Sequence, residues 1–151
     1  MKSTDALSGL EASLQKTRGW LVELEDELDR TAPGGARIRR PDPQEAYHAL
    51  RAVLHLLRDH LPLPEVAQLG AQLPIVVRGL YYEGWRPASP KERDLAAELA
   101  RAHHELGGER SLVDPEAALR AAFAVVSRHV SPGELADVTG ALPHALRTLL
   151  A

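Results

Sequence analysis

The residues best suited to chemistry in this sequence are cationic side chains that recur along one predicted helix. His48 and His55 lie seven positions apart, so they share a helical face with Arg51 and Arg58. Such a stripe can bind an anionic ligand, and Arg51, His55 and Arg78 could border a ligand pocket between two halves of the chain. A charged face in contact with solvent is the simpler interpretation of the same pattern.

Four further histidines favour structural roles. His103 and His104 are adjacent near the end of a predicted helix, where they point about 100° apart. Neither has a carboxylate three or four residues earlier that could complete a metal site on the helix. His60 and His129 also lie near predicted helix ends, where a cationic side chain interacts favourably with the helix dipole. We therefore expect no metal site and no cofactor, and the absence of cysteine excludes thiolate ligands.

Familiar catalytic motifs are absent from the sequence. It contains no G-x-S-x-G elbow, no H-E-x-x-H pair, no phosphate-binding loop and no G-x-G-x-x-G turn. The acidic residues are predicted to be scattered along exposed helical faces, not gathered in a cleft as acid/base catalysis requires. This pattern favours a non-catalytic protein. It leaves open an enzyme or ligand-binding bundle whose site is assembled from several helices.

An internal repeat shows how the chain is organised. Residues 49–80 align without a gap onto residues 118–149 at an offset of 69, and eleven of the thirty-two positions are identical. Each copy offers an apolar helical face that the other can cover. The repeat predicts one domain, residues 1–151, with two pseudo-symmetric halves at approximately 5–85 and 89–151. The identical pairs include Leu50 with Leu119, His60 with His129, Glu65 with Glu134 and Arg78 with Arg147.

Capping residues and turn formers divide the chain into predicted helices. Helix starts are predicted at Asp42, Ser89 and Ser131. Each of these short polar residues is followed directly by proline, and glutamate stands three positions after the polar residue. Glycine and proline predict a loop at residues 31–41. No segment alternates as a strand does, so the sequence predicts an all-α helical bundle. The predicted helices cover residues 5–30, 43–61, 64–73, 74–83, 89–106, 115–130, 132–142 and 143–150.

The longest helix of each copy is predicted to form the core. Apolar residues recur there every three or four positions and cover more of the helix than one surface stripe needs. We expect side chains from both helices to meet in one cluster. The expected members are Leu50, Leu54, Leu57, Leu119, Phe123 and Val126.

The predicted helix at residues 5–30, which precedes the repeat, carries a regular seam of leucines. Its apolar positions alternate in steps of three and four, as in the heptads of a coiled coil. A seam of this kind packs against other helices, either of the same chain or of a second copy. Leu14, Leu21 and Leu24 are candidate contact residues. The whole seam consists of Leu7, Leu10, Leu14, Thr17, Leu21, Leu24 and Leu28.

A short aromatic block stands out because the sequence has only six aromatic residues. Tyr81 and Tyr82 precede Gly84 and Trp85 in this block. One interpretation is a helix stop, with Gly84 in a left-handed conformation and Trp85 folded back on the last turn. The other is a contact site for a partner, since tyrosine and tryptophan are enriched at such sites. We expect the helix stop, with Trp85 buried.

Three blocks of sequence are distinctive enough to suggest a family. They run from Gln72 to Trp85, from Ala49 to His55 and from Ser131 to Glu134. Together they resemble a bacterial family known only as domain of unknown function 2267. The resemblance covers the chain from about Gly19 to Leu150 and leaves out most of the leucine-seamed extension. It implies a duplicated helical fold and no assigned activity.

Charge and hydropathy argue against several classes of partner. The net charge is −3 and is not gathered on one face, whereas a nucleic-acid surface needs a basic patch. Only the predicted loop offers one, at Arg37, Arg39 and Arg40, so nucleic-acid binding would be weak and is not expected. No apolar run approaches the roughly 20 residues that span a bilayer, and no signal peptide is evident. We expect a cytoplasmic bacterial protein with no membrane partner.

The leading hypothesis is a non-catalytic module that acts through protein association. The expected partner is another protein or a second copy of the chain, bound through the leucine seam or through Tyr81, Tyr82 and Trp85. One alternative is a small-ligand-binding bundle or an enzyme with a pocket between the halves. The other is a weak nucleic-acid binder.

Overall fold

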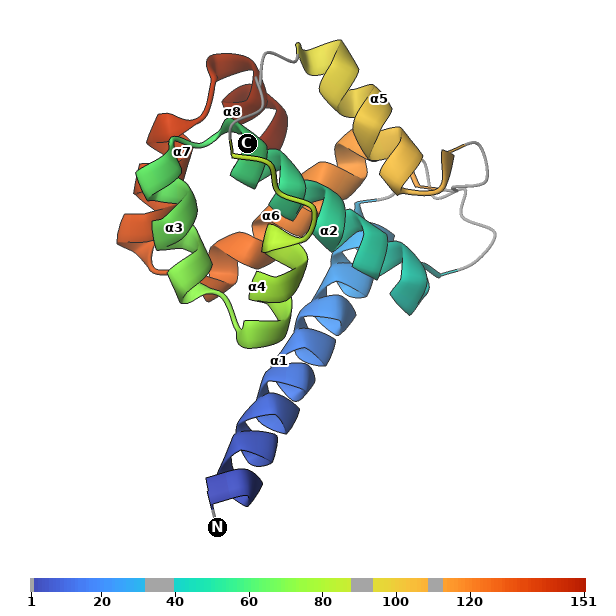
Figure 1. Ribbon diagram of the computed structural model, residues 1–151. Helices are drawn as coiled ribbons and strands as arrows, with labels where there is room; N and C mark the ends of the chain where they lie inside the picture. Colours follow the sequence, from blue (N-terminus) through green and yellow to red (C-terminus); the bar gives the residue numbers. More distant parts are fainter. Residues whose placement is uncertain (1, 32–39, 88–93, 109–112) are drawn as a thin grey trace.

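The computed structural model describes residues 2–31, 40–87, 94–108 and 113–151, and these residues form eight helices and no strand (Figure 1). The predicted all-α fold class is therefore confirmed for the described part of the chain. In chain order the helices are α1 (Lys2–Arg30), α2 (Pro43–His60), α3 (Leu63–Gln72), α4 (Ile75–Tyr82), α5 (Leu95–Glu105), α6 (Pro115–His129), α7 (Pro132–Ala141) and α8 (His144–Leu150).

Capping side chains determine where several helices begin. Asp42, Asp114 and Ser131 each accept a hydrogen bond from the amide three residues later, at 2.9–3.1 Å. Proline follows each of them in the first turn, where its missing N–H costs nothing. The predicted start of α5 at residue 89 is wrong, because Asp94 has an extended backbone and caps the helix that begins one residue later. Ser89 itself lies outside the described residues.

Helices α2 and α6 occupy the centre of the bundle (Figure 1). α2 contacts α1, α4, α5 and α6, and α6 contacts α1, α2, α5 and α8. Five of the six predicted core side chains are at most 2 % exposed, while Phe123 is half-buried at their edge. Both halves thus contribute to one connected core. That the two halves superpose by a rotation stays a prediction.

Helix α1 has a packed half and a projecting half. Its C-terminal half lies against α2 and α6, and Leu24 is fully buried there. Its N-terminal half extends away from the bundle (Figure 1). Leu7, Leu10 and Leu14 in this half are 59 %, 49 % and 44 % exposed. Residues 2–16, here named the α1 arm, therefore carry one end of the leucine seam into solvent while the other end builds the core.

We predict that Leu24→Ala lowers the free energy of unfolding by about 2–5 kcal/mol, because it leaves a cavity in the core. Leu10→Ala removes the same atoms from the same seam within the α1 arm. It should change the free energy of unfolding by about 0.5 kcal/mol or less in dilute protein. Denaturant titrations of both variants measure the difference. Equal losses would contradict the division of α1 into two parts.

Candidate functional site

The three candidate contact residues of the leucine seam have different surroundings. Leu14 lies on the α1 arm and is 44 % exposed, so it can meet a partner. Leu21 is half-buried against the core, and Leu24 is completely buried in it. In this structure Leu24 therefore belongs to the intramolecular core and not to a free surface.

The α1 arm rests on the bundle along one side only. The hydroxyl of Ser13 is buried and accepts a hydrogen bond from the amide of Val76 in α4 at 3.1 Å. Beside this contact, Ile75 is 56 % exposed, and a cavity of about 230 Å³ lies between the arm and the start of α4. The leucine face of the arm remains uncovered by the described residues.

The aromatic block forms a helix stop, as predicted. Gly84 has a φ of 70°, and the amide of Trp85 donates to the carbonyl of Tyr82 at 3.1 Å. Tyr81 is fully buried, and its hydroxyl donates to the carbonyl of Val66 at 2.9 Å, so it is not exposed to a partner. Trp85 is half-buried against Tyr82, with ring centroids 5.5 Å apart, so the expected burial is only partly right.

His55 and Arg51 face neighbouring helices. His55 is 4 % exposed, and its Nε2 lies 2.8 Å from the carbonyl oxygen of Leu80 in α4. Arg51 donates to Glu83 at 3.2 Å, and the side chains of Arg51 and His55 both lie within 4.0 Å of Glu105 in α5. Burial of Glu105 opposes ionisation, but the contacts with His55, Arg101 and Arg51 outweigh it and lower the pKa of Glu105. The expected solvated face is therefore wrong at His55, which α4 and α5 cover, while the contact of His48 with Gln44 is exposed.

Arg78, the third predicted pocket residue, caps the C-terminal end of α3. Its guanidinium donates to the carbonyls of Gly70 at 2.7 Å and Leu73 at 2.9 Å. The equivalent Arg147 donates to the carbonyl of Leu142 at 3.2 Å in the second half. Arg78 thus has different partners from Arg51 and His55, and the structure supports a capping role for it.

A larger cavity lies where α1 meets both halves of the chain. Its volume of about 460 Å³ is within the range of small-ligand sites. The rings of Trp20 and His129 stack beside it, with centroids 4.4 Å apart and planes inclined by 18°. None of the three predicted pocket residues lines it, and ligand binding between the halves stays a prediction. The lining consists of Lys16, Gly19, Trp20, Glu23, Gln72, Pro74 and His129.

The repeated histidines join each half to an outer helix. Nε2 of His60 lies 2.8 Å from a carboxylate oxygen of Glu98 in α5, and both side chains are buried. Nε2 of His129 lies 3.0 and 3.1 Å from the two carboxylate oxygens of Glu23 in α1. The helix dipole alone does not account for these positions, because each histidine has a glutamate partner on another helix.

The position directly before each repeated histidine carries opposite charges in the two halves. Asp59 is buried in α2 and accepts from Arg101 of α5 at 3.2 Å. The equivalent residue of α6 is Arg128, which donates to Glu27 of α1 at 2.8 Å. The two outer helices therefore meet the central helices through ion pairs of reversed polarity.

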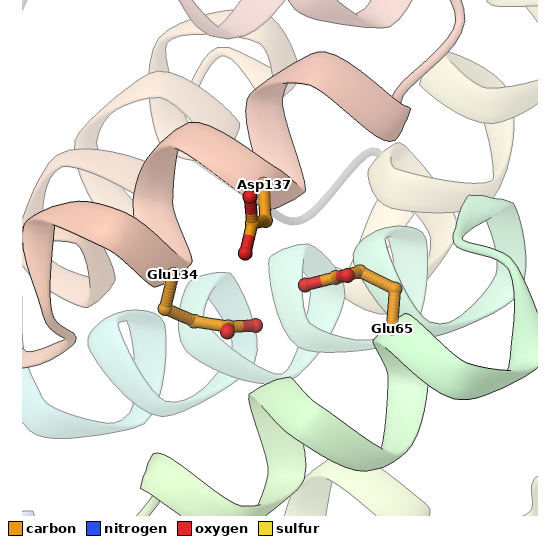
Figure 2. A group of neighbouring side chains, drawn as sticks. All are labelled: Glu65, Glu134 and Asp137. Atoms are coloured by element: carbon orange, nitrogen blue, oxygen red, sulfur yellow. The ribbon is translucent and has the colours of Figure 1, made fainter.

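Three carboxylates converge between α3 and α7. Glu65 of α3 and Glu134 and Asp137 of α7 point toward one another, and one oxygen from each lies within 4.8 Å of the others (Figure 2). The expectation that acidic residues are scattered on exposed faces is wrong here. The available signal was the repeat, since Glu65 and Glu134 are equivalent positions. Only the packing of α3 on α7 brings them together.

The convergence changes the ionisation of Glu134. Its burial, its contact with Glu65 and the charges of Glu65 and Asp137 raise the pKa of Glu134 to about 7. A carboxyl group with carboxyl neighbours shares a proton or binds a cation more readily than an isolated one. This site is chemically distinctive, and the sequence alone did not predict it.

The remaining predictions concern nucleic acid and membranes. Arg37 and Arg39 lie outside the described residues, and Arg40 forms an ion pair with Asp26 of α1. Among the described residues, no helix has the length and apolar character required to cross a bilayer.

Comparison with known proteins identifies a family. A family model described as "Uncharacterized conserved protein (DUF2267)" matches residues 35–149. The match begins after α1, later than the expected start near Gly19. A search of curated proteins finds no significant match.

We predict that Trp85→Ala lowers the free energy of unfolding by about 2 kcal/mol, because the partly buried indole packs against the core. Trp20→Ala, at a tryptophan that is 3 % exposed, should cost about 3–5 kcal/mol. Chemical denaturation of both variants provides the comparison. No loss for Trp85→Ala would instead favour a partner-contact role for Trp85.

We predict that protein kept in a chelator becomes less stable as the pH rises from 4.5 to about 7. Glu134 retains its proton in the folded state over this range, whereas the unfolded chain releases it at the ordinary pKa of 4.5. Glu134→Gln should lose less stability over the same range. Thermal melts of both proteins at several pH values test this. Parallel curves would show that Glu134 does not titrate as described.

Proposed function

Because the chain belongs to the DUF2267 family, whose description assigns no activity, we propose a function from the structure: a non-catalytic helical module that self-associates through the α1 arm. The exposed leucine face at Leu7, Leu10 and Leu14 carries this proposal. Fully burying one leucine side chain contributes about 1.5–3 kcal/mol, so a partner that covered this face would be stabilised.

The spacing of the exposed leucines favours a helix as the partner. It is the heptad spacing that packs the other half of α1 into the bundle. The α1 arm is about 22 Å long, which is enough for roughly two heptads of contact. An interface of this size supports a weak and reversible association.

A second copy of the chain is the partner that the arm fits best. In a two-fold dimer one patch supplies both sides of the contact, so two leucine faces can cover each other. The charges of the arm and its next turn are nearly balanced, with Lys2, Lys16 and Arg18 against Asp5 and Glu11. Two arms would therefore not repel one another strongly.

The proposal is tested by measuring mass against concentration. Sedimentation equilibrium of the full chain should show a monomer at low concentration and a dimer in the high micromolar range. Leu10→Glu and Leu14→Glu each place a charge on the leucine face, where a dimer would have to bury it at high cost. Each should shift the dissociation constant at least about tenfold toward monomer, equivalent to about 1.4 kcal/mol.

Gln15→Glu is the matched control. It adds the same charge to the same arm at an exposed position outside the leucine seam, and it should leave the dissociation constant nearly unchanged. A wild-type chain that remains monomeric at high micromolar concentration would overturn self-association. An equal shift in all three variants would show that charge, and not the leucine face, controls it.

A further inference from the structure

Among the described residues, the carboxylates of Glu65, Glu134 and Asp137 meet in a group that contains no basic side chain. Figure 2 shows all three side chains directed into the space between α3 and α7. Asp137 is exposed, so this space is open to solvent on one side. Glu134 is only 6 % exposed and lies on the inner side.

Two of the carboxylate oxygens have no hydrogen-bond partner among the described residues. They are Oε1 of Glu65 and Oε1 of Glu134, and both atoms are buried. Leaving a buried polar atom unpaired destabilises the folded state, and more so when the atom is charged. A folded protein keeps such atoms at low cost only if a cation, an ordered water or a proton shared between the carboxyl groups satisfies them.

Neither glutamate is used to cap its own helix. Glu134 occupies the capping-box position, from which it would accept from the amide of Ser131. That amide instead donates to Oε1 of Gln72 at 2.7 Å, and the amide group of Gln72 donates to the Ser131 hydroxyl at 3.1 Å. The cap of α3 is Pro62, which has no N–H to donate to Glu65. Both carboxylates are thus free to act between the helices.

We propose that Glu65, Glu134 and Asp137 bind a divalent cation of the calcium type that joins α3 to α7. Calcium takes oxygen ligands at about 2.3–2.6 Å, so two oxygens on one ion lie at most about 5 Å apart. The three oxygens here, within 4.8 Å of one another, satisfy this limit. Magnesium usually keeps several waters and takes one or two protein carboxylates in a strict octahedron, so three converging carboxylates favour calcium. The solvent side beside Asp137 admits the waters that complete the shell.

The competing explanation is that the glutamates only stabilise the positive ends of their helices. Glu65 and Glu134 both lie in first turns, where a negative charge interacts favourably with the helix dipole. This explanation requires no third carboxylate and predicts no response to calcium. Glu116 is also a first-turn glutamate, in α6, and it lies outside the cluster. It therefore provides a matched control.

Titration calorimetry of the chelator-treated full chain with calcium chloride tests the proposal. The wild type and Glu116→Gln should bind one calcium ion per chain. Glu134→Gln and Asp137→Asn should each weaken binding at least about tenfold, since affinity depends on the number of charged ligands. Asp137 is exposed, so its variant keeps the fold even if the change at the buried Glu134 disturbs it. Circular dichroism of each variant checks the fold.

Two results would overturn the site. One is the absence of saturable calcium binding by the wild type up to about 5 mM, above the range of weak protein sites. The other is unchanged affinity in both Glu134→Gln and Asp137→Asn. Saturable binding of magnesium chloride without binding of calcium would overturn the calcium assignment.

Discussion

The contact between α2 and α6 is the interaction on which the rest of the structure depends. Each of these helices is apolar around much of its surface, so the short helices that follow it in its own half cannot cover it alone. Leu50, Leu54 and Leu57 lose their exposure in the same core as Leu119 and Val126. α1, α4, α5 and α8 pack against this pair, and α3 packs against α4 and α7. The hydrophobic effect that buries the pair therefore stabilises the centre of the bundle.

Polar contacts around that core determine which outer helix lies where. α5 meets α2 through His60 with Glu98 and through Asp59 with Arg101, and the buried members of these pairs must be satisfied. α1 meets α6 through His129 with Glu23 and through Arg128 with Glu27.

Reversed polarity at the equivalent positions Asp59 and Arg128 discriminates between the two outer helices. If α1 and α5 exchanged places, Arg101 would approach Arg128 and the acidic face of α1 would approach Asp59. Like charges in contact disfavour that arrangement, so the ion pairs contribute specificity beyond their modest stability.

Two features of the molecule do not stabilise the helical bundle. The α1 arm leaves three leucines in solvent although the same seam is buried further along the helix. The carboxylate cluster leaves two buried oxygens unpaired, although the amide of Ser131 was within the reach of the capping motif of Glu134. Local departures from self-consistency of this kind are expected at functional positions, because a bundle optimised only for stability would remove them.

The sequence by itself determined the helices and the core. Capping residues and the three- and four-residue spacing of apolar side chains act within one or two turns, so they can be recognised without knowing the fold. Gly84 at the helix stop and the core positions on α2 and α6 follow from such local rules. The helix start at Asp94 was missed because a stronger-looking cap motif preceded it.

Only the tertiary structure decided how these elements are used. Leu14 and Leu24 are alike in the seam, yet one is exposed and the other is in the core, because the bundle covers only half of α1. His55 looked like an exposed cation until α4 and α5 covered it. Glu65 and Glu134 are 69 residues apart, and no local pattern indicates that they meet. Burial and long-range proximity depend on how all the helices pack together. Patterns of residues along the sequence do not specify that packing.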